Sequence, residues 1–388
     1  MVECDSVLGG SAMPQKKHLV VGVDYYTPYV SGLTNAARDI AEGLADRGWR
    51  VTVVAAQHST QVPLRETIGG VEVIRVPKIG QFGKGVISPR LPAVCARQIS
   101  QADVGLLHLP MPEAGPIASL LRRRTPLIAM YHCDVHLPAS LTNRYVEKAV
   151  DVSSRTCVRR CGRVVVTSSD YLSSSRLRSA IWDKHVAISP PAHVRPIGTP
   201  AYRDGHGPHI GFLGRLVEEK GIPYLIEAFQ RVAAADWRLL IGGDYEAVAG
   251  GSVIRQFTHV LGEDPRIRLL GFIPDERMGD FYASLDVFAF PSVNSLEAFG
   301  IAQLEAMFSG VPVVASNLPG VRQPLLHTGL GRLVPPRDVA ALANALQEVA
   351  KEPKSAWKGR ADSAKSSYGL AGCIDSWDEL LLASSRTP

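Results

Sequence analysis

Residues 209–229 read HIGFLGRLVEEKGIPYLIEAF, and this stretch decides the fold class. The apolar run His209–Leu213 predicts a buried strand. A turn that carries Gly214 and Arg215 follows, and we predict a helix that begins near Ile222. A short buried strand that passes through a glycine turn into a helix is typical of parallel α/β sheets.

The same alternation of short apolar runs and longer helical patterns extends through most of the chain. In the N-terminal half it predicts the strands Leu19–Val23, Val51–Ala55, Val71–Val76, Val104–Leu109, Leu127–Tyr131 and Val164–Thr167. In the C-terminal half it predicts, after His209–Leu213, the strands Trp237–Ile241, Ile267–Leu270, Val287–Phe290, Pro312–Ala315 and Gly331–Val334. The stretch Leu33–Arg47 has the apolar spacing of one helical face, and Gly48 is placed as a helix-terminating glycine.

The stretch Ser189–Pro208, SPPAHVRPIGTPAYRDGHGP, separates the two series of strands. It is rich in Pro and Gly and has no periodicity, which predicts a linker between domains. A chain of 388 residues is long for one core and comfortable for two domains. We therefore expect two doubly wound domains with a cleft between them, in which ligands bind at the carboxyl ends of the strands.

The composition is that of a globular protein, with 46% hydrophobic and 20% charged residues. No apolar run approaches the roughly 18 residues of a membrane helix. The first seventeen residues are polar and small, and Leu19–Val23 is too short for the apolar core of a signal peptide. We therefore expect a cytoplasmic protein, and we leave open a peripheral contact with the inner face of the membrane.

Charge is unevenly distributed between the two halves. Residues 1–200 contain 24 Lys and Arg against 15 Asp and Glu, a net charge of +9, whereas residues 201–388 contain 18 against 22, a net charge of −4. A basic half is compatible with an anionic substrate, with a membrane surface or with a solvated arginine-rich face.

The cysteines do not form the paired spacing of a structural zinc site, although Cys157 and Cys161 lie one helical turn apart. We interpret them as small buried thiols. The six are Cys4, Cys95, Cys133, Cys157, Cys161 and Cys373.

Two cations lie in the loop that follows the strand His209–Leu213. Arg215 and Lys220 are five residues apart, between the carboxyl end of a strand and the amino end of a helix. A planar guanidinium, an ammonium and a helix dipole together neutralise a diphosphate well, and Gly214 and Gly221 allow close approach of the backbone. The alternative is a surface loop with solvated cations.

A second motif, SLEAFGIAQLEAM at Ser295–Met307, follows the strand Val287–Phe290. If the helix begins near Phe299, Glu297 lies in the preceding loop and Glu305 about two turns inside. The first carboxylate can then accept sugar hydroxyls and the second a ribose, unless both simply cap or solvate the helix. The exposed N–H groups at the start of the helix predict an anion site, formed by Phe299, Gly300 and Ile301.

Two further candidates lie in the N-terminal half, each after a predicted strand. Gly32 lies in the loop that leads from the first strand into the first helix, where a backbone N–H can meet a phosphate or a sugar across the cleft. His132 follows the strand Leu127–Tyr131, flanked by Tyr131 and Asp134. A lone histidine is usually structural, but the end of a strand at the predicted cleft favours a catalytic role.

Some motifs are absent from the sequence. No two aspartates are separated by a single residue, so the common acidic clamp for a metal–diphosphate complex is missing. There is no Walker-type loop, and no Gly-x-Gly-x-x-Gly follows the first strand. These absences disfavour nucleotide hydrolysis and dinucleotide redox chemistry.

Taken together, the motifs resemble glycosyltransferase family four, the retaining enzymes of GT-B fold. The most specific element is the pair Glu297 and Glu305 with seven residues between them, and the segment Gly214–Gly221 matches in order and spacing. The resemblance extends from Leu19 to about Trp377. It implies an N-terminal acceptor-binding Rossmann-like domain over 1–194, joined by a C-terminal helix at 371–388 that crosses back, and a nucleotide-sugar-binding Rossmann-like domain over 195–370, facing a deep cleft.

The resemblance also implies roles for single residues. Arg215 and Lys220 would hold the donor diphosphate, and Glu305 would bind the ribose. Glu297 and His132 would act at the reacting sugar. The remaining implied contacts are the backbone of Phe299, Gly300 and Ile301 with the sugar and phosphate, and the turn Gly271–Pro274 around Ile273 with the base. Tyr131 and Asp134 are assigned to the acceptor because they flank His132 at the end of the same predicted strand. Many members have two glycines where this chain has Ser31 and Gly32, so only Gly32 is assigned to the donor.

The implied function is a retaining, metal-independent transfer of a hexose-type sugar from a nucleoside diphosphate, with UDP favoured over GDP by family frequency. The acceptor would be a small molecule, a lipid or a glycan in bacterial glycoconjugate or natural-product biosynthesis. We expect no cofactor, no metal and no nucleic acid, and a monomer or homodimer. The alternatives are a sugar-nucleotide epimerase of the same fold and a non-catalytic sugar-nucleotide-binding protein.

Overall fold

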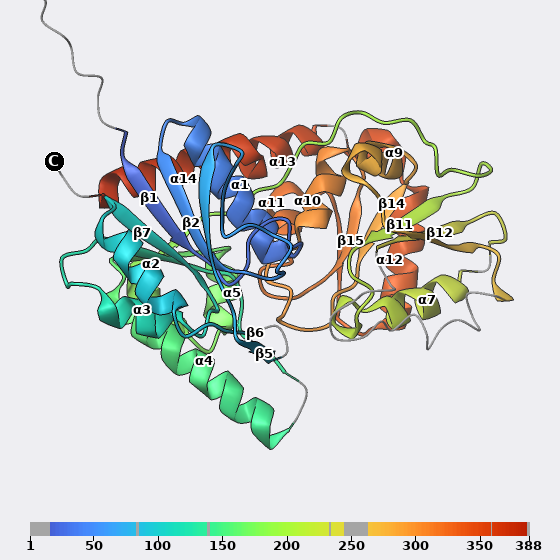
Figure 1. Cartoon of the computed structure of the whole chain (residues 1–388). Helices are drawn as coiled ribbons and strands as arrows, with labels where there is room; N and C mark the ends of the chain where they lie inside the picture. Colours follow the sequence, from blue (N-terminus) through green and yellow to red (C-terminus); the bar gives the residue numbers. More distant parts are fainter. Residues whose placement is uncertain are drawn as a thin grey trace, which may run out of the picture.

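Figure 1 shows the computed structural model, in which two α/β domains lie side by side. The structure describes residues 16–82, 85–137, 140–232, 234–243, 263–357 and 359–385. The segment that precedes Lys16, on which the expectation about a signal peptide mostly falls, lies outside the described residues, as does Cys4. Among the described helices, none combines the length and the apolar composition needed to cross a bilayer.

The N-terminal domain is built on an eight-stranded sheet in the order β10-β9-β8-β7-β1-β2-β4-β3. All neighbouring strands are parallel except β3, which pairs antiparallel with β4. The strands are β1 (His18–Gly22), β2 (Arg50–Ala56), β3 (Arg65–Ile68), β4 (Val71–Val76), β7 (Val104–Leu109), β8 (Leu127–Tyr131), β9 (Arg163–Val166) and β10 (His185–Ala187); a separate hairpin contains β5 (Gly80–Phe82) and β6 (Gly85–Ile87). The six predicted strands of this half are present within one residue of their predicted ends.

Helices cover both faces of this sheet. They are α1 (Gly32–Asp46), α2 (Leu91–Ser100), α3 (Ala114–Leu120), α4 (Leu141–Arg160), α5 (Ser169–Ser174) and α6 (Arg178–Ile181), followed by the 3₁₀ turn η1 (Trp182–Lys184). The predicted helix Leu33–Arg47 corresponds to α1. The Ser31 hydroxyl accepts a hydrogen bond from the Thr34 N–H at its start, and Gly48, with φ of 91°, follows its last turn.

The C-terminal domain contains a six-stranded, fully parallel sheet in the order β13-β12-β11-β14-β15-β16. Its strands are β11 (His209–Leu213), β12 (Arg238–Gly242), β13 (Ile267–Gly271), β14 (Val287–Phe290), β15 (Val313–Ser316) and β16 (Gly331–Val334). Its helices are α7 (Ile222–Gln230), α9 (Met278–Ala283), α10 (Ile301–Phe308), α11 (Gln323–Thr328) and α12 (Val339–Lys351), with the 3₁₀ turns η2 (Glu218–Lys220), η4 (Asp275–Arg277) and η5 (Lys354–Trp357). All six predicted strands are present.

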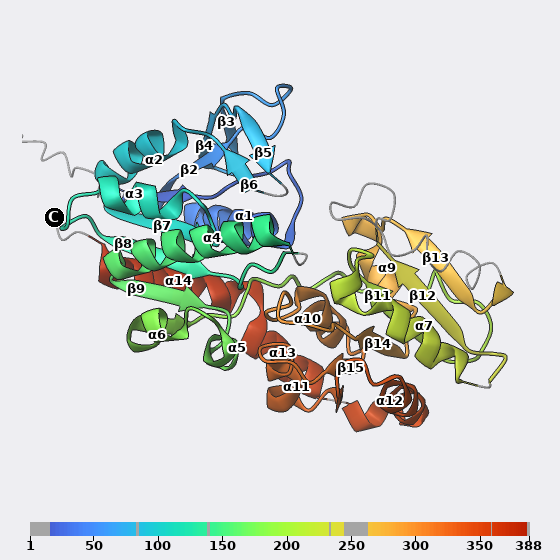
Figure 2. The ribbon, with the colours of Figure 1, turned by 90° about the horizontal axis from the view of Figure 1, so that it is seen from below.

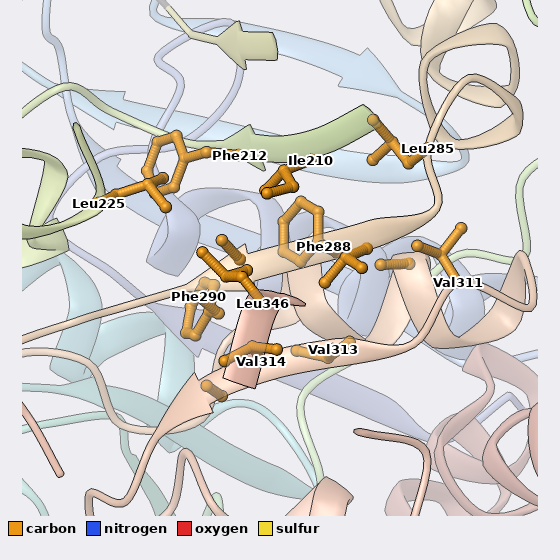
Figure 3. Packing of buried hydrophobic residues seen from close by; sticks show 14 of the residues in the cluster. Ile210, Phe212, Leu225, Leu285, Phe288, Phe290, Val311, Val313, Val314 and Leu346 are labelled. Atoms are coloured by element: carbon orange, nitrogen blue, oxygen red, sulfur yellow. The ribbon is translucent and has the colours of Figure 1, made fainter. Parts of the chain in front are cut away.

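The core of the C-terminal domain lies between this sheet and its helices. Figure 3 shows Phe212 of β11 beside Leu225 of α7, and Phe288 and Phe290 of β14 beside Leu346 of α12. All five side chains are almost completely buried. This packing fixes the ends of β11 and β14, the two strands that carry the candidate site.

The chain passes between the domains through residues 188–208, which form no helix or strand in the structure, as the composition of this stretch predicts. It returns through α13 (Arg360–Tyr368) and α14 (Leu370–Ser384). Figure 2 shows α14 lying along the N-terminal sheet. Its Trp377 and Leu381 are fully buried in the same cluster as Leu44 of α1, so the last helix belongs to the N-terminal core.

Candidate functional site

Each sheet has one point at which the order of its strands reverses. In the C-terminal sheet, β12 lies on one side of β11 and β14 on the other. In the N-terminal sheet, β2 lies on one side of β1 and β7 on the other. Loops diverge at such a point, and ligands of open α/β sheets bind there, at the carboxyl ends of the strands. The loops after β11 and β14 are those that contain the two predicted motifs.

The loop after β11 depends on a glycine to reach the loop after β14. Gly221 has φ of 70°, a left-handed conformation that favours glycine. A Cβ atom at this position would lie 2.0 Å from the carbonyl oxygen of Pro291. The absence of a side chain at Gly221 therefore allows the start of α7 to pack directly on the turn that follows β14.

The structure brings Lys220 and Glu297 together from these two loops. Their side chains form an ion pair, and both side chains are mostly buried. The Lys220 ammonium lies 5.3 Å from the centroid of the Phe290 ring. Arg215 is more exposed, and its guanidinium donates to Glu219 at 3.1 Å. Two cations and the two carboxylates that pair with them thus stand beside the amino ends of α7 and α10.

Helix α10 begins at Ile301, two residues later than predicted. Gly300 precedes it with φ of 93°, and a Cβ atom there would lie 2.6 Å from the Phe290 ring. No side chain among the described residues caps this helix, so its first N–H groups remain available for an anion. Phe299, which precedes Gly300, is buried.

Glu305 is buried inside α10 with partners on both carboxylate oxygens. Its Oε1 accepts from Arg195 Nη2 at 2.8 Å and from Arg195 Nε at 3.1 Å, and its Oε2 accepts from the Tyr282 hydroxyl at 3.1 Å. Burial raises the pKa of the Glu305 carboxyl, and the Arg195 guanidinium opposes that rise. Arg195 was not predicted from the sequence, because a single arginine in a linker has no periodic or motif signal.

The remaining residues that the sequence predicted near the donor are Ile273 and Gly32, together with Ser31 beside Gly32. Ile273 is buried in the turn after β13, and its side chain packs toward Gly242. Gly32 is the first residue of α1, and a Cβ there would have no neighbour within 4 Å in the described residues. Its lack of a side chain is therefore not required by packing. Ser31 is explained by its hydroxyl, which caps α1.

His132 lies against a second histidine, His108, which no motif in the sequence had indicated. His108 Nδ1 and His132 Nε2 are 2.8 Å apart, and the two rings stack with centroids 5.1 Å apart. Burial lowers the pKa of His132 to about 4, and burial together with His132 lowers the pKa of His108 well below its usual value. Both imidazoles are therefore neutral at pH 7, and one of them donates the shared hydrogen bond.

This histidine pair makes stability depend on pH. The unfolded chain takes up protons on these imidazoles near pH ~6.5, whereas the native pair resists protonation down to lower pH, so we expect the free energy of unfolding to fall as the pH is lowered from about 6.5 to about 4. His132→Asn should flatten this dependence, measured by urea denaturation at stepped pH. The exposed His206→Asn serves as the control. Equal pH dependence in wild type and His132→Asn would contradict the assignment.

Tyr131 and Asp134, which were expected to contact the acceptor, lie inside the N-terminal domain. Their side chains hydrogen-bond to each other, and the Tyr131 hydroxyl also lies 3.0 Å from Ser175 Oγ. Asp134 Oδ2 accepts from the Arg176 N–H at 3.2 Å. Both residues are almost completely buried. We therefore reassign them from the acceptor to the internal support of the loop after β8.

Two buried carboxyls at the reversal point of the N-terminal sheet were also not selected. Asp24 follows β1 and Glu113 follows β7. Within the described residues, Asp24 Oδ1 and Glu113 Oε2 have no hydrogen-bond partner. Burial raises the pKa of both carboxyls, and Glu113 raises that of Asp24 further. The pair lies at the edge of the N-terminal domain that would face a second substrate. In the sequence, Asp24 was marked only by its position directly after the first predicted strand.

Contacts between the domains form beside the second motif. Ser295 Oγ lies 2.9 Å from His136 Nε2, and the Tyr171 hydroxyl donates to the Ser295 carbonyl at 3.0 Å. Asp170 of α5 pairs with Arg322 at 2.6 Å. The loop after β8 and helix α5 after β9 therefore contact the loops after β14 and β15, which places the carboxyl edges of the two sheets next to each other.

The sequence is similar to known proteins over both domains. Residues 31–191 match the "Glycosyl transferase 4-like domain" family, and residues 207–352 match "Glycosyl transferases group 1". The phosphatidyl-myo-inositol mannosyltransferase of Mycobacterium leprae is 30% identical over 331 residues, which cover 81% of this chain and 82% of that protein.

Solved structures share the fold at lower identity. Sucrose-phosphate synthase from Thermosynechococcus elongatus superposes with a TM-score of 0.76 at 19% identity, over 95% of this chain and 99% of that one. Anabaena Alr3699/HepE in complex with UDP and glucose superposes with a TM-score of 0.72 at 19% identity, over 95% and 100%. With two parallel-sheet domains, both family matches and a relative similar over four fifths of its length, the chain belongs to glycosyltransferase family four and is a glycosyltransferase of GT-B fold.

Proposed function

We propose that this glycosyltransferase transfers a hexose from a nucleoside diphosphate to a hydroxyl of its acceptor, with retention of anomeric configuration and without a metal ion. One observation carries the proposal. Lys220 and Glu297 meet across the strand-order reversal of the C-terminal sheet, beside the uncapped amino end of α10. This point combines an anion site with a carboxylate able to accept sugar hydroxyls.

The donor would lie along the carboxyl edge of the C-terminal sheet. Lys220, Arg215 and the first N–H groups of α10 would bind the diphosphate, Glu297 the hexose and Glu305 the ribose. The turn around Ile273 would border the base. The Anabaena structure that shares this fold contains UDP and glucose, which supports a uridine donor in preference to a guanosine donor.

The reaction breaks the bond between the anomeric carbon and the β-phosphate oxygen and forms a bond between that carbon and an acceptor oxygen. In a front-face transfer, the acceptor hydroxyl passes its proton to an oxygen of the departing phosphate, so no protein base is required. The negative charge that grows on the diphosphate is stabilised by Lys220, Arg215 and the dipole of α10, which are held in place before the reaction begins. No metal is proposed, because these groups supply the positive charge and the sequence has no Asp-x-Asp clamp.

The acceptor would bind to the N-terminal domain. The neutral pair His108 and His132 can donate and accept hydrogen bonds, and Asp24 and Glu113 can accept them from hydroxyls. These groups suit a polyhydroxylated acceptor, whether a small molecule, a lipid headgroup or a glycan. The mannosyltransferase of M. leprae, by its name, acts on phosphatidyl-myo-inositol, which is a lipid of this kind.

A direct test incubates the purified protein with UDP- or GDP-hexoses and a panel of acceptors, in the presence of a chelator. The panel contains myo-inositol, phosphatidylinositol vesicles and a metabolite extract of a bacterium. We expect a mass increase of one hexose on an acceptor, undiminished by the chelator, and an anomeric coupling in the NMR spectrum that matches the donor. Loss of transfer in the presence of the chelator would contradict the metal-independent reaction. A product whose anomeric configuration is opposite to that of the donor would contradict retention.

Incubation of the donor without acceptor separates the alternatives. An epimerase would convert the donor to an isomer, and a binding protein would bind it without transfer or slow hydrolysis. We expect no isomer and a slow release of free hexose, because water is a poor substitute for the acceptor.

A further inference from the structure

Arg195 lies in the irregular segment between the domains, yet its side chain reaches the donor half of the molecule. Only 16% of the side chain is exposed. Two of its nitrogens donate to Glu305 Oε1, at 2.8 and 3.1 Å, and Nη1 lies 3.7 Å from Asp275 Oδ2. The guanidinium thus stands between α10 and η4, the turn that follows the strand end at Gly271.

These two neighbours mark the nucleoside half of the proposed donor site. Glu305 is the residue proposed to bind the ribose, and Asp275 directly follows the turn proposed to border the base. Arg215 and Lys220, the cations proposed for the diphosphate, have other partners, Glu219 and Glu297 respectively. Arg195 is therefore placed to act on the nucleoside and not on the leaving group.

The hydrogen bonds of Glu305 limit what else it can accept. A carboxylate offers about four lone-pair positions. Arg195 uses two of them on Oε1, and the Tyr282 hydroxyl uses one on Oε2. Within the described part of the chain, one acceptor position on Oε2 remains. The carboxylate is fixed by three hydrogen bonds, which orients this last position.

Arg195 also determines whether Glu305 is charged. Burial raises the pKa of this carboxyl, whereas Arg195, Tyr282 and His193 lower it, in that order. Removal of the guanidinium takes away the largest opposing influence. A protonated carboxyl would donate one hydrogen bond and lose part of its capacity to accept from a hydroxyl.

The same short stretch of backbone is fastened to the other domain. His193 Nε2 lies 2.9 Å from Asp39 Oδ2 in α1. The hydrogen bond to Asp39 raises the pKa of His193, and His193 and Arg38 lower that of Asp39. Contacts two residues apart therefore hold the linker to α1 on one side and to α10 on the other, which restricts where the Arg195 side chain can go.

We propose that Arg195 is a positioning residue that holds Glu305 ionised and oriented, so that its last acceptor position takes one ribose hydroxyl. This inference rests on the proposed function. It assigns to Arg195 the selection of ribonucleotides over deoxyribonucleotides.

The test measures nucleotide binding by titration calorimetry between about pH 6 and pH 8. UDP and GDP are titrated first, and the tighter one is compared with its 2′-deoxy and 3′-deoxy forms. A hydrogen bond to a charged group corresponds to about a tenfold to hundredfold difference in affinity. We therefore expect wild type to bind the ribonucleotide more tightly than one of its deoxy forms by this factor. In Arg195→Gln this preference should fall to about threefold or less. As the pH is lowered, nucleotide binding by this variant should begin to weaken at a higher pH than binding by wild type does.

Arg203→Gln is the matched control. Arg203 lies in the same linker segment and pairs with Asp286 at 2.8 Å, before the amino end of β14 and so at the opposite edge of the sheet. It should keep the wild-type preference and pH profile. Arg195→Lys, which keeps the charge but loses the planar fork, should keep the pH profile and lose most of the preference.

The outcomes separate the two proposals. If Glu305→Gln loses the preference but Arg195→Gln keeps it, the role of Arg195 is refuted and that of Glu305 stands. A full preference in Arg195→Lys would refute it as well, even if Arg195→Gln did not fold. If wild type binds neither UDP nor GDP, or if Glu305→Gln is unchanged, the proposed donor site fails and the inference about Arg195 fails with it.

Discussion

Replacement of Lys220 by Ala should lower kcat/KM for sugar transfer by at least about a thousandfold. Removal of one neutral donor to a developing negative charge costs about a hundredfold to a thousandfold, and Lys220 supplies a full charge. Its ammonium is mostly shielded from water and lies over the Phe290 ring, so solvent screens it only weakly. The variant also leaves Glu297 unpaired, a negative charge beside the departing diphosphate.

The measurement is steady-state transfer with the donor and acceptor found by the incubation experiment. Lys354→Ala is the matched control, because Lys354 is 84% exposed and its 3.7 Å contact with Asp286 lies at the amino end of β14. It should turn over like wild type. Circular dichroism should show both variants folded. Near-normal turnover of a folded Lys220→Ala would refute the assignment of the diphosphate site.

The sequence allowed the fold to be predicted because both sheets are mainly parallel. Parallel strands are buried on both faces, so they appear as short continuous apolar runs that are easily recognised. Among the described strands, those that were missed are β3 and β10, at the two edges of the N-terminal sheet, and β5 and β6, in the separate hairpin. β3 (Arg65–Ile68) alternates exposed and half-buried residues, and β10 (His185–Ala187) has only three residues. Neither contains a run of apolar residues long enough to be distinguished from a loop.

The loops of the candidate site could be predicted for the same reason, since the position of a residue after a strand places it at the carboxyl edge. The face on which its side chain lies could not be predicted. Tyr131 and His132 are adjacent, and neighbouring side chains in extended chain point to opposite sides. Tyr131 turns toward Ser175 and the interior, whereas His132 meets His108. Both were assigned to the site on their position alone.

Other members of the site depend on contacts between distant parts of the chain. Arg195 and Glu305 are 110 residues apart, and Lys220 and Glu297 are 77 apart. A motif at Glu297–Glu305 indicates the helix but not the partner of each carboxylate. The pairing of Glu305 with a linker arginine is decided by how the two domains pack, which a single sequence does not record.

Replacement of Trp377 by Ala should have the largest effect on stability, lowering the free energy of unfolding of the N-terminal domain by about 3–5 kcal/mol. Trp377 lies on α14 and is fully buried against the core around α1. Trp377 is among the largest fully buried side chains, so its loss leaves a cavity beneath α14. This helix follows the C-terminal domain in the sequence and is joined to the N-terminal core mainly by packing. Urea denaturation, followed through the N-terminal domain, gives the measurement.

Two variants identify the cause of that loss. The Trp377 indole Nε1 has no hydrogen-bond partner in the part of the chain that the structure describes, so Trp377→Phe should cost only about 1–2 kcal/mol, mostly from lost volume. Trp182→Ala makes the same substitution in the same domain at a side chain that is 41% exposed, and it should cost about 1 kcal/mol. If Trp377→Phe were as destabilising as Trp377→Ala, the packing explanation would be wrong. If Trp377→Ala cost no more than Trp182→Ala, α14 would contribute little to the N-terminal core, and its place in the fold would not depend on burial of its tryptophan.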